Sequence, residues 1–184
     1  MPIFARRKLV LHDDCLSPVR GGPLPGVPYI TLDYSGPNPQ NIYHKIKELL
    51  VSIWKVDASE VQERDFIWDR SKGIEKFRVR FEVIKDLDRF SFLHIIVRLN
   101  GEAKPSKEFG KEGKATIRIE GRLRTEYPQD TLWQRSLLYE MARVFYHRVF
   151  YEEKRKRYLE DCRVDILKFI SELKSFLAIL SKHE

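Results

Sequence analysis

The sequence is poor in cysteine and has no long hydrophobic run. Cys15 and Cys162 are the only cysteines in 184 residues and lie in unlike contexts, which excludes a disulfide framework and is typical of a reducing compartment. Residues 1–11 lack the apolar segment of a signal peptide, and no apolar run approaches the roughly 18 residues of a membrane-spanning helix. We therefore expect a cytoplasmic protein without membrane contact.

Amide side chains are also scarce, whereas charged side chains are abundant. Four Gln and three Asn stand beside 34 Lys and Arg and 27 Asp and Glu, a balance typical of thermophilic proteins with surface ion-pair networks. The net charge of +7 and the pI near 9.4 allow a polyanionic partner such as nucleic acid, without requiring one. The hydrophobic share of 42% indicates a folded chain, and the length indicates one domain with appendages.

Glycine and proline are absent after Pro128, and most prolines lie near the start of the chain. Seven of nine prolines and four of nine glycines fall within the first 39 residues, so residues 1–27 are predicted to form an extended arm. The stretch after Pro128 is rich in helix formers, and a single helix of about 50 residues would be about 75 Å long. We expect it to bend between Tyr151 and Tyr158, or to project as an arm.

Between these regions the hydrophobic period changes. Residues 28–34 alternate as a strand does, and residues 41–56 carry apolar side chains at helical spacing. Residues 60–125 alternate again, with turns predicted at 71–73 and 85–89 and a loop at 100–113, which gives four antiparallel strands. The sequence thus predicts an α+β fold: a four- to five-stranded antiparallel sheet, one helix before it, and a long C-terminal helix or bent helix pair packed on one face.

The long helical stretch has two apolar patterns. The residues of its first half that are expected to pack against the sheet are Trp133, Leu137, Leu138, Met141, Val144 and Phe145. Its second half has apolar residues at an alternating spacing of three and four, which is a heptad-like seam. The predicted partner-helix interface comprises Leu159, Cys162, Ile166, Phe169, Leu173, Phe176 and Leu180. The seam suits a second copy of the chain or a partner protein, and packing on the protein's own domain fits equally well.

The predicted domains are an N-terminal arm at 1–27, an α+β core at 28–150 and a C-terminal helical extension at 151–184. Arginines alternate with apolar residues along the predicted strands of the core and therefore share the outward face of the sheet. This set is Arg78, Arg80, Arg98, Arg118, Arg122 and Arg124, together with outward-facing Phe92. Planar guanidinium groups beside an aromatic ring suit the phosphates and bases of RNA or DNA. Alternatively, Glu82 and Glu120 pair with these arginines across the strands.

Other chemistry-bearing residues give weaker signals. The basic run Lys154–Arg157 has acids four residues before and after it, so a salt-bridged helix face is predicted rather than a binding patch. Residues 12–15 include metal-ligand types, but adjacent residues in an extended chain point in alternating directions and cannot all face one ion. His94 lacks an evident acidic or nucleophilic partner and is interpreted as structural. We expect no catalytic residues, metal or cofactor, and favour a non-enzymatic function.

The order of strand, helix, four antiparallel strands and long helix resembles that of the helix-grip proteins of the START and polyketide-cyclase type. The resemblance covers residues 28 to about 150 and departs in having one early helix where that family has two. It implies an apolar ligand cavity between sheet and C-terminal helix. Three hypotheses follow: a non-catalytic component of a nucleic-acid or ribonucleoprotein assembly, a scaffold subunit associating through the C-terminal helix, and a small-ligand-binding protein.

Overall fold

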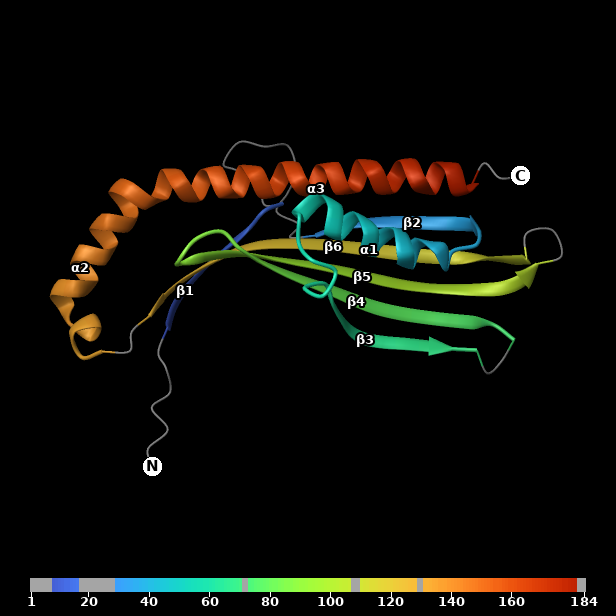
Figure 1. Cartoon of the computed structure of the whole chain (residues 1–184), viewed down its shortest axis with the longest axis horizontal. Helices are drawn as coiled ribbons and strands as arrows, with labels where there is room; N and C mark the ends of the chain where they lie inside the picture. The colour runs from blue at the N-terminus through green and yellow to red at the C-terminus, as the bar shows by residue number, and fades with distance from the viewer. Residues whose placement is uncertain (1–7, 17–28, 71–72, 107–109, 129–130, 182–184) are drawn as a thin grey trace, which may run out of the picture.

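A computed structural model describes residues 8–16, 29–70, 73–106, 110–128 and 131–181. Six strands and the helical segments form an α+β protein in which helices cover one face of an antiparallel sheet, as predicted (Figure 1). The strands are β1 (Lys8–Asp14), β2 (Tyr29–Pro37), β3 (Gln62–Asp69), β4 (Glu75–Asp86), β5 (Ser91–Ser106) and β6 (Gly110–Pro128). The helical segments are α1 (Asn41–Trp54), η1 (Trp133–Arg135), α2 (Leu137–Tyr146), η2 (His147–Tyr151) and α3 (Glu152–Ser181).

The sheet has one strand more than the largest number predicted. Its order is β1-β6-β5-β4-β3, and β2 pairs with β6 along the same edge as β1. The two strands divide this edge, because β1 pairs with residues 122–128 and β2 with residues 112–120. The additional strand, β1, lies inside the predicted arm at 1–27. Its hydrogen-bonding partner is more than a hundred residues away, so no local turn signal marks it. Residues 1–7 and 17–27 of the arm lie outside the described residues.

The β5–β6 hairpin is longer than the sequence predicted. The stretch 100–113, interpreted as a loop, continues both strands, which pair from Asn100↔Thr116 as far as Ser106↔Gly110. Opposite charges face one another on this extension, as in Glu102↔Lys114, and such cross-strand pairs favour strand pairing. Gly113 permits the close approach, since a Cβ there would lie 1.9 Å from the carbonyl oxygen of Glu102.

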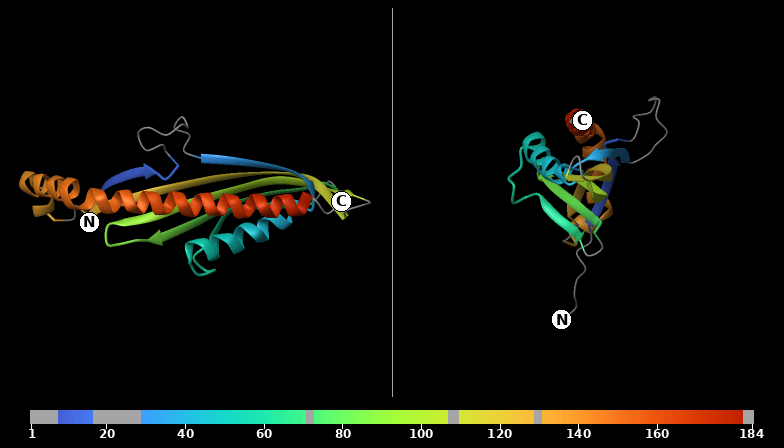
Figure 2. Two further views of the ribbon diagram at one scale, coloured as in Figure 1. Left: turned by 90° about the horizontal axis from the view of Figure 1, so that it is seen from above. Right: turned by 90° about the vertical axis from the view of Figure 1, so that its right-hand side faces the viewer.

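The hydrophobic core lies between the inner face of the sheet and the helices α1 and α3 (Figure 2). Trp54 of α1 and Phe169 of α3 are fully buried, with ring centroids 5.6 Å apart, and Phe81 of β4 is equally buried. These rings fill the space in which the helix-grip resemblance implied a ligand cavity. α3 is therefore part of the packed core, although it was assigned to an extension beyond it.

A disulfide joins the two cysteines, contrary to the expectation from their scarcity and separation. Cys15 directly follows β1, and its bond to Cys162 of α3 has a Cα–Cα distance of 5.9 Å. Gly121 provides the room, because a Cβ there would lie 2.4 Å from the Cδ1 methyl of Ile166. Glycine at this position lets α3 approach the sheet beside the bridge. Since the cysteines are paired, they no longer support a reducing compartment.

The C-terminal helical stretch bends, which is one of the two predicted outcomes, but the bend falls at the π-helical turn η2, which meets the predicted range 151–158 only at Tyr151. π-helical turns are a recognised cause of helix kinks. α3 runs along the sheet, whereas α2 lies beyond the strand ends (Figures 1 and 2). The prediction that the first half of this stretch packs its apolar residues on the sheet is wrong: Trp133, Leu137, Leu138, Met141, Val144 and Phe145 are all exposed. The bend carries them past the end of the sheet.

Candidate functional site

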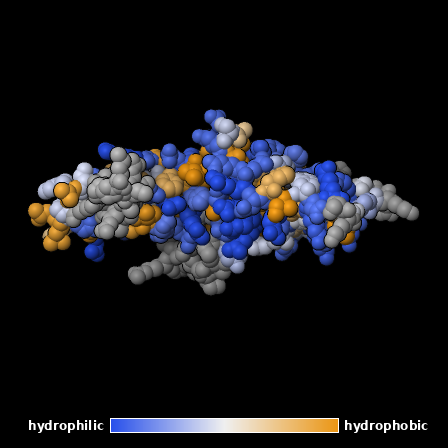
Figure 3. Space-filling model, turned by 90° about the horizontal axis from the view of Figure 1, so that it is seen from below, coloured by the Kyte–Doolittle hydropathy of each residue, from blue (hydrophilic) through white to orange (hydrophobic). Residues whose placement is uncertain are grey.

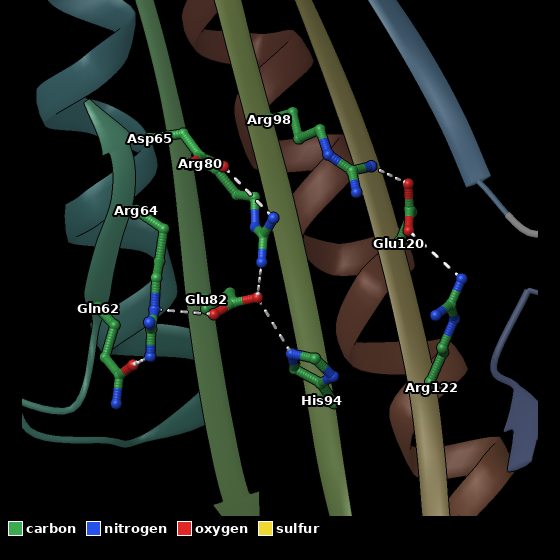
Figure 4. Close-up of polar contacts among 9 residues, drawn as sticks. All are labelled: Gln62, Arg64, Asp65, Arg80, Glu82, His94, Arg98, Glu120 and Arg122. Atoms are coloured by element: carbon green, nitrogen blue, oxygen red, sulfur yellow. Dashed lines mark hydrogen bonds and ion pairs between the residues drawn. The ribbon is translucent and has the colours of Figure 1, made fainter. Parts of the chain in front are cut away.

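Four arginines lie side by side across the outward face of the sheet. Arg64 of β3 pairs in register with Arg80 of β4, Arg80 with Arg98 of β5, and Arg98 with Arg118 of β6. Neighbouring strands are about 4.8 Å apart, so a row of this kind would repel itself without counter-charges. The next cross-strand row supplies them, since it contains Glu82 and Glu120 (Figure 4).

Glu82 is nearly buried and holds three neighbours. Its Oε1 accepts from Arg80 at 2.5 Å, its Oε2 lies 3.2 Å from Arg64 Nε, and His94 Nε2 lies 3.6 Å away (Figure 4). Burial alone would raise the pKa of Glu82, yet the hydrogen bond from Arg80 and the surrounding positive charges hold this pKa below its ordinary value. Burial lowers the pKa of His94, and together with the charges of Arg124 and Arg122 it outweighs the raising effect of Glu82, so the imidazole is a weak partner at neutral pH.

Glu120 has the same role one strand pair further on. Its carboxylate is hydrogen-bonded by Arg98, lies 3.0 Å from Arg118 Nε and lies 3.6 Å from Arg122. Its side chain is 5% exposed, whereas the three arginines keep 35–43% of their side-chain surface exposed. The two buried carboxylates therefore hold the central arginines in place. Of the two possibilities that the sequence left open for this face, the geometry is that of Glu82 and Glu120 paired with the arginines.

The remaining predicted residues on this face have other partners. Arg124 lies over the ring of Phe92, 5.3 Å from its centroid, and pairs with Glu126 at 3.6 Å. Arg118 also stacks on Tyr29, with its guanidinium carbon 3.5 Å from the ring centroid. The face is thus charged but largely self-compensated, and its aromatic rings are occupied by guanidinium groups.

Arg78 differs from the other arginines. It is exposed, and no ion pair to it forms within the described part of the chain. It lines an open hollow of about 510 Å³ on the outward face, together with Lys76 and Lys114, which are likewise without an ion pair there. Asn100 and Thr116 add polar groups to the same lining. The same lining contains two carboxylates: Asp69 lies in register opposite Lys76, and Glu102 lies between Lys76 and Lys114. The hollow therefore carries three cations against two acids, and Arg78 is the cation without an acid in register.

The heptad-like seam lies inside the protein. Cys162, Ile166, Phe169 and Leu173 are fully buried, Leu180 is nearly so, and Leu159 and Phe176 pack partly buried against the core. The chain's own sheet and α1 therefore occupy the surface predicted for a partner helix. Of the two arrangements left open by the sequence, the structure has the intramolecular one.

The basic run before the seam is paired throughout, and two of its four members have the helical partners that the sequence predicted. Lys156 lies 2.9 Å from Glu152 and Arg157 lies 2.7 Å from Glu153, both at the spacing of one helical turn. The other two members reach the sheet: Lys154 pairs with Asp88, and Arg155 pairs with Asp13. This run is a structural contact and not a free basic patch.

Most of the large apolar side chains that are exposed in the described part of the chain lie on and around α2. These side chains are about half exposed or more, and we call them the α2 apolar face. The members are Leu132, Trp133, Leu137, Leu138, Met141, Val144, Phe145, Tyr146, Val149 and Phe150. Figure 3 shows hydrophobic side chains gathered at this end of the molecule.

The polar side of α2 faces the protein instead. Arg143 is the buried residue of this helix at 9% exposure, and its guanidinium lies over the ring of Tyr127, 5.3 Å from the centroid. The Tyr127 hydroxyl lies 2.8 Å from Nδ1 of His147. One turn further, Tyr151 is buried against Ser91. α2 is therefore an amphipathic helix with its usual orientation reversed, its polar stripe docked and its apolar stripe outward.

Sequence reasoning found the apolar stripe of α2 but assigned it to the core. The spacing of Arg143, His147 and Tyr151 marks an opposite polar stripe, and that stripe is the side that docks. Helical periodicity separates two faces of a helix without saying which one meets the protein. The face that docks can be identified only from the three-dimensional positions of Tyr127 and of the strand ends.

Comparisons with known proteins find no relative: no family model matches the chain, and no curated protein is significantly similar to it. Neither α1 nor any other described helix has the uninterrupted apolar length that a bilayer-spanning segment needs.

Proposed function

We propose that the protein is a non-catalytic interaction subunit that docks through the α2 apolar face. The observation that carries this proposal is the reversed orientation of α2. A helix that buries an arginine while leaving leucine, methionine and phenylalanine in water is unfavourable for an isolated protein. The apolar stripe gains free energy only when a further surface covers it, and exposed patches of this kind mark interaction sites.

The proposal is tested by removing apolar character from the face without touching the core. Met141→Lys places a charge at the centre of the α2 apolar face, and Ile179→Lys places the same charge on α3, at a similarly exposed apolar residue. We expect binding of the dye bis-ANS, or self-association, to be reduced in Met141→Lys and unchanged in Ile179→Lys over a dilution series from micromolar to nanomolar protein. Equal behaviour of the wild type and both variants at every concentration would contradict the proposal.

A second candidate function is phosphate binding at the hollow around Arg78, which would make the protein a component of an RNA or DNA assembly. The observation that favours it is exposed Arg78, which forms no ion pair within the described part of the chain and lines the hollow with Lys76 and Lys114, against the two acids Asp69 and Glu102. Lysine and arginine that contact phosphates release counterions, so binding weakens with salt, with a slope of about one per contact. The central arginines Arg80, Arg98 and Arg118 would border such a ligand.

Fluorescence anisotropy with labelled single-stranded and duplex RNA and DNA, titrated in a salt series, tests this second function. Arg78→Glu and Lys114→Glu are expected to weaken binding and to reduce the salt slope by about one each. Lys156→Glu is the matched control, because Lys156 is paired on the far helix. Absence of binding near physiological salt, or an equal loss in the control, would rule out the hollow as a phosphate site.

A further inference from the structure

The geometry points to a second copy of this chain as the occupant of the α2 apolar face. This inference rests on the proposed function and names the partner. Two copies would place their α2 helices against one another about a two-fold axis, so that the same residues are contributed by both. Closed two-fold pairs are the commonest arrangement of soluble oligomers, and their interfaces use one patch twice.

The size of the face fits such an interface. It has ten large side chains, each about half exposed or more. At roughly 100 Å² of exposed surface each, they present on the order of 1,000 Å². The largest apolar patch of a typical monomer is about 300–600 Å², whereas a stable interface buries about 800 Å² on each partner. The α2 apolar face therefore exceeds an ordinary surface patch and reaches the area that a dimer requires.

The composition of the face also fits a protein partner. Interface cores are enriched in aromatic residues, Met and Arg and depleted in Lys, Asp and Glu. The α2 apolar face contains Trp133, Met141, Phe145 and Phe150, and exposed Arg148 lies among them. From Leu137 to Tyr151 there is no lysine, and the single acid, Glu140, belongs to the polar side with Arg143.

A lipid surface fits less well. Interfacial helices carry Lys and Arg flanking their apolar side, which attract anionic headgroups. Among the described residues of α2 and η2, Arg148 is the one exposed cation beside the face, and Arg143 is buried. The next residues of the chain are the exposed acids Glu152 and Glu153. The electrostatic part of membrane attraction is therefore weak at this end of the molecule.

Sedimentation velocity and light scattering of the full chain test the inference. We expect the wild type and Ile179→Lys to have the mass of a dimer at micromolar concentration. The dissociation constant of the dimer should rise at least about a hundredfold in Met141→Lys and in Val144→Lys, because each variant would bury a lysine at the interface. Thermal unfolding at equal monomer concentration verifies that the variants fold. A wild-type monomer at high micromolar concentration, or a dimer that Met141→Lys leaves intact, would overturn the inference.

Two further results separate this inference from the proposed function. Flotation of a monomeric wild type with phosphatidylcholine–phosphatidylglycerol vesicles, abolished by Met141→Lys, would replace the second copy with lipid and leave the interaction function standing. A monomer that neither floats nor binds bis-ANS through α2 would remove both.

Discussion

The hydroxyl of Tyr151 lies 2.6 Å from the hydroxyl of Ser91, which precedes it by 60 residues. Ser91 also contacts Thr125 of β6 at 2.7 Å, and the Tyr151 hydroxyl donates to the carboxylate of Asp88 at 3.0 Å. These buried contacts attach the bend between α2 and α3 to the end of the sheet. The direction in which α2 leaves the domain, and with it the outward position of its apolar face, is therefore fixed by polar contacts.

Tyr151→Phe removes the hydroxyl and should lower the free energy of unfolding by about 1–3 kcal/mol, because Ser91 and Asp88 lose a buried partner. Denaturant unfolding measures this loss. Tyr146→Phe is the control, since Tyr146 is half exposed and stacks on Tyr151 through its ring. A Tyr151→Phe variant as stable as the wild type would show that the bend does not depend on this network.

The docking of α2 should depend on pH through His147. Burial lowers the pKa of His147, and the charges of Arg155 and Arg143 lower it further against the opposing effects of Glu152 and Asp13. In the unfolded chain a histidine titrates near 6.5. The unfolded state therefore binds the proton more readily, so this contribution to stability is complete above about pH 6.5 and is lost as the pH falls towards the folded pKa.

Unfolding measured between pH 7.5 and 5 should show this loss, and His147→Gln should reduce the slope. His94 has a lowered pKa for a similar reason and accounts for part of the remaining slope. An unchanged pH dependence in His147→Gln would mean that His147 does not titrate with folding.

Glu120→Gln removes the counter-charge of three arginines. The expected cost is about 2 kcal/mol, less than the roughly 3–5 kcal/mol of a fully buried pair, because Arg98, Arg118 and Arg122 remain partly hydrated. Arg78→Gln should change stability by less than about 0.5 kcal/mol, since Arg78 is exposed and holds no described partner. Thermal unfolding of both variants measures the difference. Equal small effects would show that the arginine row is stable without its carboxylate.

Reduction of the Cys15–Cys162 bridge should destabilise the fold by about 4–5 kcal/mol in the chain-entropy model, because the bridge closes a loop of well over a hundred residues. Urea unfolding with and without reductant measures this. A Cys15→Ser/Cys162→Ser variant should match the reduced protein and be insensitive to reductant. Identical unfolding of the wild type in both conditions would mean that the bridge does not form in solution.

Much of the sheet could be predicted from local pattern. The alternation along β2, β4 and β6 and the helical spacing of α1 each specify which side chains are inward, and the structure confirms them. β1 could not be found in this way, because it pairs with the edge of β6, more than a hundred residues further along the chain. The extended β5–β6 hairpin was missed for a related reason: a stretch with Gly, Pro and Lys indicates a loop until its register with the opposite strand is known.

The candidate sites divide in the same manner. Alternation placed Arg80, Arg98 and Arg118 on one face, but the register alone shows that they are neighbours in one row and that Glu82 and Glu120 lie in the next. For α2, the pattern identified two faces, and the contacts of Arg143 and His147 with Tyr127 decide which one docks. The sequence predicted the polar and apolar surfaces, and tertiary contacts determine which of them are covered.

The central claim is that the α2 apolar face is outward in the single chain and covered on association. Because both cysteines are bridged, Met141→Cys would carry the one free thiol, and its rate of maleimide modification reports the exposure of the face. Ile179→Cys, at similar exposure on α3, is the control. We predict equal modification rates of the two variants in dilute protein, and protection of Met141→Cys alone as the concentration rises. Protection of Met141→Cys at every concentration, down to the monomer, would mean that this face packs inside the chain and would contradict the account.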